Sequence, residues 1–334
     1  MPEGLKPQPA PRASEPGVVR FYNFLPHGES FLEDVLAGLA GAQKSIPPKY
    51  FYDEDGCRLF EAICELPEYY LTRTELDILQ SRAVEIAQFV GPDAELIEFG
   101  SGTQEKTRVL IEVLRPSLYV PVDIAGDTLR AASGELAKQF YWLNIMGICA
   151  DYTRPLALPE FAGVPIRRKV VFFPGSTVGN FTPAEALAFL RQARRAAGTG
   201  GILLIGVDLK KDKKILDAAY DDSRGVTAQF NLNLLKRINR ELGGDFQINR
   251  FRHKAFYDPM MGRIEMHLES LHSQLVHVGD RRFDFGTGET IHTEISCKYS
   301  MEEFRDIGRK AGFSPERFWT DSAQLFAVHG MMAV

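Results

Sequence analysis

Cysteine, excess positive charge and long apolar runs are all scarce in this sequence, and each absence excludes a class of protein. The four cysteines form no Cys-x-x-Cys pair, which argues against a disulfide framework and a structural zinc site. Because 39 Lys and Arg face 44 Asp and Glu, the protein lacks the broad positive field that attracts nucleic acid or anionic membranes. No apolar run approaches a membrane span. We therefore expect a cytoplasmic protein with neither a nucleic-acid nor a membrane partner.

Residues 1–17 differ from the rest of the chain in composition. They hold five prolines and no apolar run, which is typical of a disordered segment and not of a signal peptide. We expect a disordered leader at 1–17, with the folded protein after it.

Three histidines, His267, His272 and His277, are candidates for a metal site because they lie close in sequence. They fall in a stretch that alternates like a strand, where a spacing of five places neighbours on opposite faces. The outer two share a face but lie roughly 33 Å apart at strand rise. Since zinc ligands must converge within about 2 Å of one ion, we expect no metal.

Short apolar segments alternate with helical ones from about residue 94. The predicted strands are 94–99, 118–123, 145–149, 169–173 and 202–207. Strands that alternate with helices predict a parallel sheet covered on both faces, so the fold class is α/β and Rossmann-like.

Two regions interrupt this alternation. Residues 18–90 and 210–245 have mostly helical periodicity, whereas 251–297 alternates with period two, as antiparallel strands do. We predict a second α+β domain that binds substrate and is assembled from both sides of the sheet domain. The predicted boundaries are 75–209 and 298–334 for the cofactor-binding sheet domain, and 18–74 and 210–297 for the substrate-binding domain.

The loop Gly100-Ser101-Gly102 joins the first predicted strand to a helix. Glycines there let the backbone turn tightly and approach a ligand closely. The dinucleotide fingerprint requires a third glycine where this chain has Glu105, an anion beside the place of a pyrophosphate. A ligand with an adenosine but no phosphates, such as S-adenosylmethionine, fits better. An NAD-dependent oxidoreductase remains the alternative.

Two carboxylates follow the next predicted strands. Asp123 is placed to accept hydrogen bonds from both hydroxyls of a ribose. Asp151 is placed to accept from an adenine amino group, with Tyr152 covering the ring. Each acid alone could be a turn former, but such features at three successive strand ends favour a nucleotide-type site.

Four longer motifs lie outside the glycine loop. They are Tyr50-Phe51-Tyr52-Asp53, Leu66-Pro67-Glu68-Tyr69-Tyr70, Phe173-Pro174-Gly175-Ser176-Thr177-Val178-Gly179-Asn180-Phe181 and Thr293-Glu294-Ile295-Ser296-Cys297-Lys298. In these motifs, and from about residue 20 to the C-terminus, the sequence resembles the histidine-specific methyltransferases of ergothioneine biosynthesis. The resemblance implies a class I methyltransferase fold and three successive methylations of the α-amino group of L-histidine, which give hercynine. We expect a monomer.

The resemblance also implies the site residues. By resemblance, the cofactor is held by Gly100, Lys106, Asp123, Asp151 and Tyr152. The predicted histidine site consists of Tyr52, Phe60, Tyr69, Gly175, Asn180, Tyr220, Thr227, Met266, Glu294 and Ser296, with Asn180 and Tyr69 as the catalytic pair.

These residue types suit the implied chemistry. Methyl transfer needs a neutral amine, and the Asn180 amide can hydrogen-bond the α-amino or carboxylate group without adding charge. Tyr52 and Tyr220 can donate to the carboxylate. The aromatic side chains Tyr69, Phe60 and Tyr52 suit an amine that ends as a fixed cation.

Glu294 and Ser296 stand two apart in a strand-like segment, so both face one side and can together hydrogen-bond the nitrogens of an imidazole. Two alternatives stay open from the sequence. One is a methyltransferase that acts on another amino acid, such as a tryptophan derivative. The other is a noncatalytic sensor that binds S-adenosylmethionine without turning it over.

Overall fold

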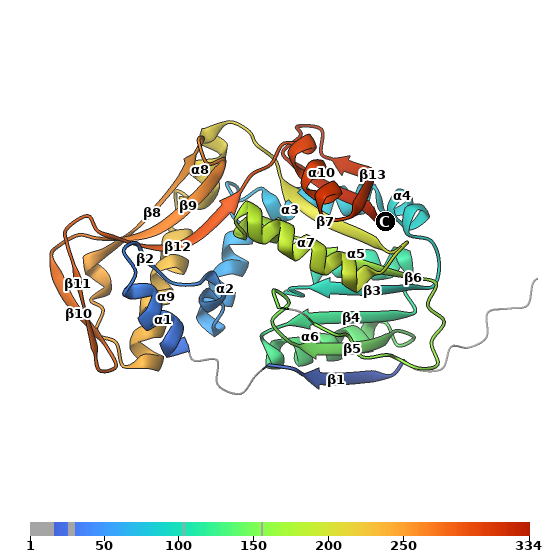
Figure 1. Ribbon diagram of the computed structural model, residues 1–334, viewed down its shortest axis with the longest axis horizontal. Coiled ribbons are helices and arrows are strands. Elements are labelled where there is room, and N and C mark those ends of the chain that lie inside the picture. The colour runs from blue at the N-terminus through green and yellow to red at the C-terminus, as the bar shows by residue number, and fades with distance from the viewer. Residues whose placement is uncertain (1–16, 26–30, 103, 155) are drawn as a thin grey trace, which may run out of the picture.

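The computed structural model describes residues 17–25, 31–102, 104–154 and 156–334. The predicted leader therefore lies outside the described residues, except for Gly17. An eight-stranded sheet and a four-stranded sheet lie toward opposite ends of the long axis (Figure 1). In the part of the chain that the structure describes, no helix is long and apolar enough to cross a membrane.

The large sheet contains all five strands predicted from the alternating segments. In spatial order its strands are β1 (Val19–Asn23), β5 (Asn144–Cys149), β4 (Leu118–Asp123), β3 (Ala94–Phe99), β6 (Arg168–Phe173), β7 (Ile202–Asp208), β14 (Phe326–Ala333) and β13 (Phe313–Thr320). Strands β1 to β7 of this order pair in parallel, and β14 pairs antiparallel to both β7 and β13. The predicted Rossmann-like α/β sheet is confirmed.

Helices cover both faces of the large sheet. They are α3 (Leu71–Ser81), α4 (Ala83–Val90), α5 (Glu105–Leu114), α6 (Gly126–Gln139), α7 (Pro183–Ala197) and α10 (Met301–Lys310). Neighbours on a strand point to opposite faces, so Leu96 joins one hydrophobic cluster with Leu110 of α5, whereas Ile97 joins another with Phe189 of α7. Burial on both faces explains why β7 is mostly apolar, whereas β3 also buries Glu95 and Glu98.

The second part of the molecule packs helices against the four-stranded sheet. Its helices are α1 (Phe31–Leu39), η1 (Pro48–Phe51), α2 (Glu54–Cys64), α8 (Lys213–Tyr220), α9 (Val226–Leu242) and η3 (Ile248–Arg250). Its strands are β2 (Lys44–Ser45), β8 (Phe251–Asp258), β9 (Arg263–Ser270) and β12 (Thr290–Cys297), with a hairpin of β10 (Gln274–Val278) and β11 (Arg281–Phe285). The short helix η2 (Thr177–Asn180) follows β6 and lies between the two parts.

One segment falls on the other side of the predicted domain boundary. We assigned residues 18–74 to the substrate-binding domain, but residues 19–23 form β1, which pairs with β5 at the edge of the large sheet. A five-residue strand is too short for its period to be distinguished from that of a helix. The other predicted boundaries stay a prediction.

His329 on β14 supplies a prediction about stability. The side chain is fully buried, its ring nitrogens have no hydrogen-bond partner among the described residues, and burial lowers its pKa to about 3. The unfolded chain takes up this proton near pH 6.5, so folding stability should fall by roughly 1.4 kcal/mol per pH unit below that value. In His329→Leu, the free energy of unfolding measured with denaturant should fall less steeply with decreasing pH below 6.5, by about 1.4 kcal/mol per pH unit. Equal slopes for the two proteins would contradict this assignment.

Candidate active site

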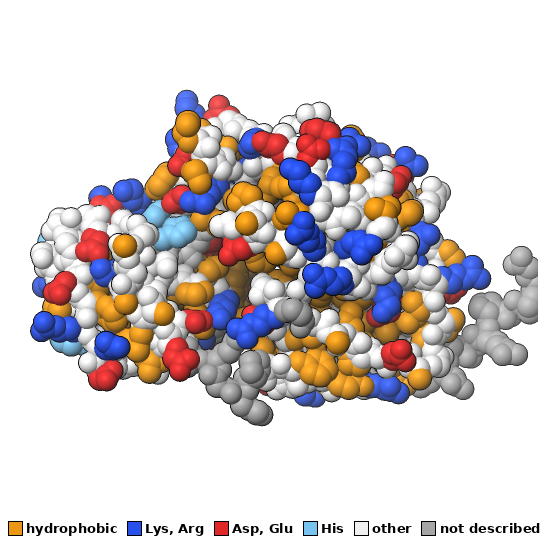
Figure 2. All heavy atoms as spheres, in the orientation of Figure 1, with side chains coloured by type: hydrophobic (Ala, Val, Ile, Leu, Met, Phe, Trp, Pro, Cys, Tyr) orange, Lys and Arg blue, Asp and Glu red, His pale blue; other side chains and the backbone are white. Residues whose placement is uncertain are grey.

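A cavity lies between the segment after β6, the helices α2, α8 and α9, and the four-stranded sheet. All ten residues predicted for the histidine site line it: Tyr52, Phe60, Tyr69, Gly175, Asn180, Tyr220, Thr227, Met266, Glu294 and Ser296. These positions span 245 residues of sequence, so only the fold brings them together. Figure 2 shows a hollow with hydrophobic side chains on its walls between the two parts of the molecule.

Among the described residues, five more line the same cavity. They are Ile63, Ser176, Thr177, Ala219 and Phe230. Ser176 and Thr177 stand within the motif that contains Asn180, so their position in the sequence was a usable signal. Ile63, Ala219 and Phe230 lie in helical segments where periodicity indicates packing alone, and nothing in the sequence separates them from core residues.

Aromatic rings form one wall of the cavity. Phe60 lies 5.8 Å from Tyr52 and 6.2 Å from Tyr69 between ring centroids, in edge-on arrangements, and Tyr69 lies 6.1 Å from Tyr220. Phe230 of α9 extends this wall, 5.9 Å from Tyr52. Ring faces attract cations, including quaternary ammonium groups, so this wall suits an amine that gains methyl groups.

The polar end of the cavity is built on two paired strands. Glu294 of β12 lies opposite Met266 of β9, and Ser296 follows two residues later on the same strand. Burial raises the pKa of Glu294 to about 7, and the positive charge of Lys298 opposes this rise. Near neutral pH the carboxyl group is therefore close to the midpoint of its titration, and a small change in its surroundings changes the fraction that is ionised.

The Tyr220 hydroxyl has a partner within the protein that the sequence did not predict, because it donates to the Ser296 Oγ over 2.9 Å. Its expected contact with a substrate carboxylate stays a prediction. The sequence offers no sign of the contact with Ser296, because Tyr220 ends α8 and Ser296 lies on β12. The two hydroxyl groups meet only when α8 packs against the four-stranded sheet.

The loop after β6 positions Asn180. Gly175 has a φ of 80° and Ser176 a φ of 57°, a left-handed pair that turns the chain sharply into η2. A Cβ on Gly179 would stand 2.8 Å from the Cys297 carbonyl oxygen. Since only glycine permits that close approach, η2 lies directly against β12, and Asn180 reaches the same cavity as Glu294.

Glu75 of α3, which the sequence did not reveal as a site residue, joins the loop after β6 to Lys106. One of its carboxylate oxygens accepts from the Gly175 backbone N–H over 2.7 Å and from the Lys106 Nζ over 2.6 Å. Glu75 is fully buried on α3, where helical periodicity predicts an apolar side chain. Lys106, predicted to hold the cofactor, is thus placed where the glycine loop and the histidine cavity meet.

The other predicted cofactor residues gather at the carboxyl ends of β3, β4 and β5. Gly100 and Gly102 have φ values of 73° and 37°, and a Cβ on Gly102 would meet no atom closer than 4.0 Å. Asp123 accepts from the Ala125 backbone N–H over 2.9 Å, and burial raises its pKa. Tyr152 stacks on Phe99 with 5.8 Å between ring centroids. This arrangement offers backbone groups and a carboxylate to an adenosine.

Asp151 and Ser101 occupy different positions in this group. Ser101 is buried in the glycine loop. Asp151 accepts from the backbone N–H and hydroxyl of Thr153 over 2.9 and 2.6 Å, as a turn former does. Its predicted contact with an adenine amino group stays a prediction.

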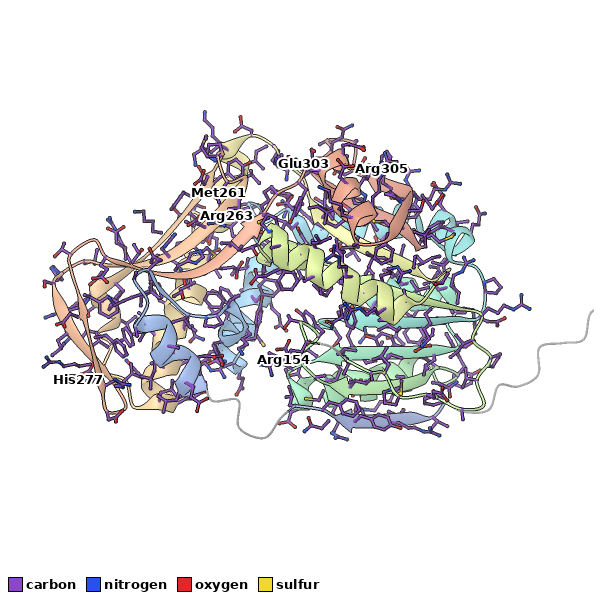
Figure 3. All side chains as sticks on the ribbon, viewed as in Figure 1. Arg154, Met261, Arg263, His277, Glu303 and Arg305 are labelled. Atoms are coloured by element: carbon purple, nitrogen blue, oxygen red, sulfur yellow. The ribbon has the colours of Figure 1, made fainter. Side chains whose placement is uncertain are left out.

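The three histidines considered as a metal site do not come together. His267 instead lies beside His292 and Glu265, and one ligand atom from each lies within 4.8 Å of the other two. Only the pairing of β9 with β12 creates this cluster, so sequence spacing could not reveal it. Arg263, labelled in Figure 3, donates to Glu265 over 2.6 Å.

This cluster of Glu265, His267 and His292 has donor atoms that could hold a divalent ion. It lies on the sheet face opposite the cavity, because His267 and the cavity residue Met266 are neighbours on one strand. Figure 2 shows histidine side chains at the surface over this part of the small sheet. A metal there would stand apart from the cavity chemistry.

The chain is similar to known methyltransferases over most of its length. Residues 31–333 match the model of a family described as histidine-specific methyltransferase, SAM-dependent. Histidine N-alpha-methyltransferase of Mycolicibacterium smegmatis is 41% identical, over 90% of this chain and 94% of that protein. The protein of the same name from Mycobacterium tuberculosis is 42% identical, over 88% and 92%. Ergothioneine biosynthesis protein 1 of Schizosaccharomyces pombe is 31% identical over 80% of this chain and 36% of that longer protein.

Proposed function

The chain belongs to the S-adenosylmethionine-dependent, histidine-specific methyltransferases, and we propose that it methylates the α-amino group of L-histidine. Three successive transfers give hercynine, the first step of ergothioneine biosynthesis. The observation that carries this proposal is the cavity in which Glu294, Ser296 and the aromatic wall meet beside the carboxyl ends of the large sheet. We propose further that the enzyme is a cytoplasmic monomer that needs no metal.

The residues at the carboxyl ends of β3 and β4 fit the methyl donor. Gly100 and Gly102 leave backbone accessible where a side chain would fill the space, and Asp123 can accept from ribose hydroxyls. S-adenosylmethionine supplies an electrophilic methyl group on a sulfonium. The protein's part is to hold the amine in line with it, and such alignment can supply about 7 to 11 kcal/mol of the barrier.

The histidine site contributes position and charge. The Asn180 amide holds the α-amino or carboxylate group without adding charge, and Glu294 with Ser296 holds the ring. The substrate ammonium sheds its proton before each transfer, because only the lone pair of a neutral amine can attack. The rings of Tyr52, Phe60 and Tyr69 then face an amine that loses N–H donors and ends as a cation, which an aromatic face tolerates.

Asp123 supplies a test of the cofactor assignment. Asp123→Ala should weaken the binding of S-adenosylmethionine by about 1.5 to 3 kcal/mol, the range for hydrogen bonds to a charged group. Calorimetry measures this, with Asp127→Ala on the exposed side of α6 as the matched control. Unchanged affinity in Asp123→Ala would mean that this carboxylate only caps the turn at Ala125. Tighter binding of NAD than of S-adenosylmethionine would contradict the cofactor itself.

The product tests the proposed reaction. Histidine incubated with S-adenosylmethionine and the purified protein should be converted through the mono- and dimethylated amines to the trimethylated betaine. Mass spectrometry of samples taken over time detects each species. Fragmentation should place every methyl group on the α-nitrogen. Binding of S-adenosylmethionine with no methylated product would instead identify a sensor.

A further inference from the structure

A buried cation lies behind the polar end of the cavity without lining it. Lys298 directly follows β12, and its side chain is fully buried. Its Nζ lies 2.7 Å from Asp208 Oδ2, 2.8 Å from Ser296 Oγ and 3.0 Å from Tyr220 Oη. An ammonium group has three N–H donors. All three of its hydrogens therefore have an acceptor, and two of these acceptors are cavity residues.

Asp208, at the end of β7, anchors this lysine. It also accepts from the Tyr70 hydroxyl over 2.8 Å and from the Lys211 Nζ over 2.5 Å. Its backbone N–H donates to the Ser176 hydroxyl over 2.9 Å. The carboxylate therefore keeps a cationic partner even without Lys298, which makes a Lys298 variant a practical experiment.

The hydrogen bonds that Ser296 already accepts leave its hydroxyl group able only to donate to a ligand. Its Oγ accepts from both Lys298 and Tyr220, which fills the two lone pairs of a hydroxyl oxygen. Its own proton is then what it can offer to the cavity. Glu294 beside it, when ionised, can only accept. One donor, Ser296, and one acceptor, Glu294, together fit a neutral imidazole, which has one N–H and one unprotonated nitrogen.

The charged groups near Glu294 also indicate a role for Lys298. No lysine or arginine is among the described residues that line the cavity. Tyr52, Tyr69 and Tyr220 face Glu294. Burial raises the pKa of Tyr69 and Tyr220, and the pKa of the more exposed Tyr52 is also raised, by desolvation and by the Glu294 charge, so all three stay neutral. Lys298 is the group that lowers the pKa of Glu294 against the effect of burial.

We propose that Lys298 is a positioning residue for the substrate ring. Its ammonium group fixes the direction in which Ser296 donates, and its charge favours the anion at Glu294. The inference rests on the proposed function, because it assigns the polar end of the cavity to an imidazole. It adds a residue that touches neither substrate nor cofactor.

The test compares two variants, Lys298→Met and Lys211→Met. The second is the control, because Lys211 is the other cation that binds Asp208 and has no hydrogen bond to Ser296 or Tyr220. In Lys298→Met, kcat/KM for histidine should fall about 10- to 100-fold, in keeping with lost hydrogen bonds to a charged group. The acid limb of its pH profile should move up by about one pH unit, because Glu294 then protonates at higher pH. The limb of Lys211→Met should not move. Substrate ionisation is common to all three proteins and cancels.

Two further measurements separate this role from a structural one. Adding Ser296→Ala to Lys298→Met should cost less than Ser296→Ala costs in the wild type, because both changes remove one interaction. If Lys298→Met folds poorly, Lys298→Gln, which keeps hydrogen-bond donors but removes the charge, carries the same test of the acid limb. An unmoved acid limb with additive losses overturns the proposal for Lys298. Wild-type protein that does not methylate histidine at all overturns the proposed function instead.

Discussion

Glu294→Ala should lose most turnover of histidine, with kcat/KM falling about 100-fold, because the ring N–H loses a charged acceptor in a buried site. Glu265→Ala is the matched control: it removes a carboxylate from the neighbouring strand, on the face away from the cavity. It should leave kcat/KM near the wild-type value. An unchanged preference for histidine after Glu294→Ala would show that this carboxylate does not bind the imidazole.

The same site should accept a larger ring when it is widened. Met266 lies directly opposite Glu294 on the paired strand, so Met266→Val adds room where Glu294→Ala has removed a polar demand. The double variant should gain measurable methylation of tryptophan, detected by mass spectrometry. The single variant Met266→Val, which keeps the carboxylate, should gain much less.

Replacing Asn180 should lower kcat far more than stability. Its amide reaches the cavity from η2, a short helix at a strand end, and loss of one preorganised donor at a reacting centre costs about 10²- to 10³-fold in kcat. Asn180→Ala should show this loss with little change in melting temperature or in affinity for S-adenosylmethionine. Asn180→Asp tests charge, because a carboxylate there would repel the substrate carboxylate. Near-normal turnover in both variants would remove Asn180 from the catalytic role.

The large sheet could be predicted because its strands are buried on both faces. Ile202–Asp208 is a mostly apolar run that ends in an aspartate, and its length and its alternation with helical segments favour a buried strand. Ala94–Phe99 carries two glutamates, but its length and its place in the same alternation favour a strand as well. Residues 19–23 were missed because an edge strand of five residues carries no such run. The predicted family membership is confirmed.

Within the site, motifs revealed residues but not the bonds between them. Glu294 and Ser296 stand in one motif, and their spacing predicts a shared face. The contact of Ser296 with Tyr220 and that of Lys298 with Asp208 depend on where β12 ends relative to α8 and β7, which no local pattern specifies. The cluster of His267 with His292 was invisible for the same reason, since strand pairing places residues 25 positions apart side by side.

The most direct test of the central claim offers the enzyme all twenty amino acids at equal concentration with S-adenosylmethionine, and counts methylated products by mass spectrometry. A site built to hydrogen-bond a polar ring rejects an analogue without those groups by roughly 10⁴ to 10⁵, because its buried partners stay unpaired. We predict α-N-methylated histidine as the dominant product, with phenylalanine and leucine unmodified. Comparable methylation of phenylalanine, or dominant methylation of another amino acid, would contradict the account.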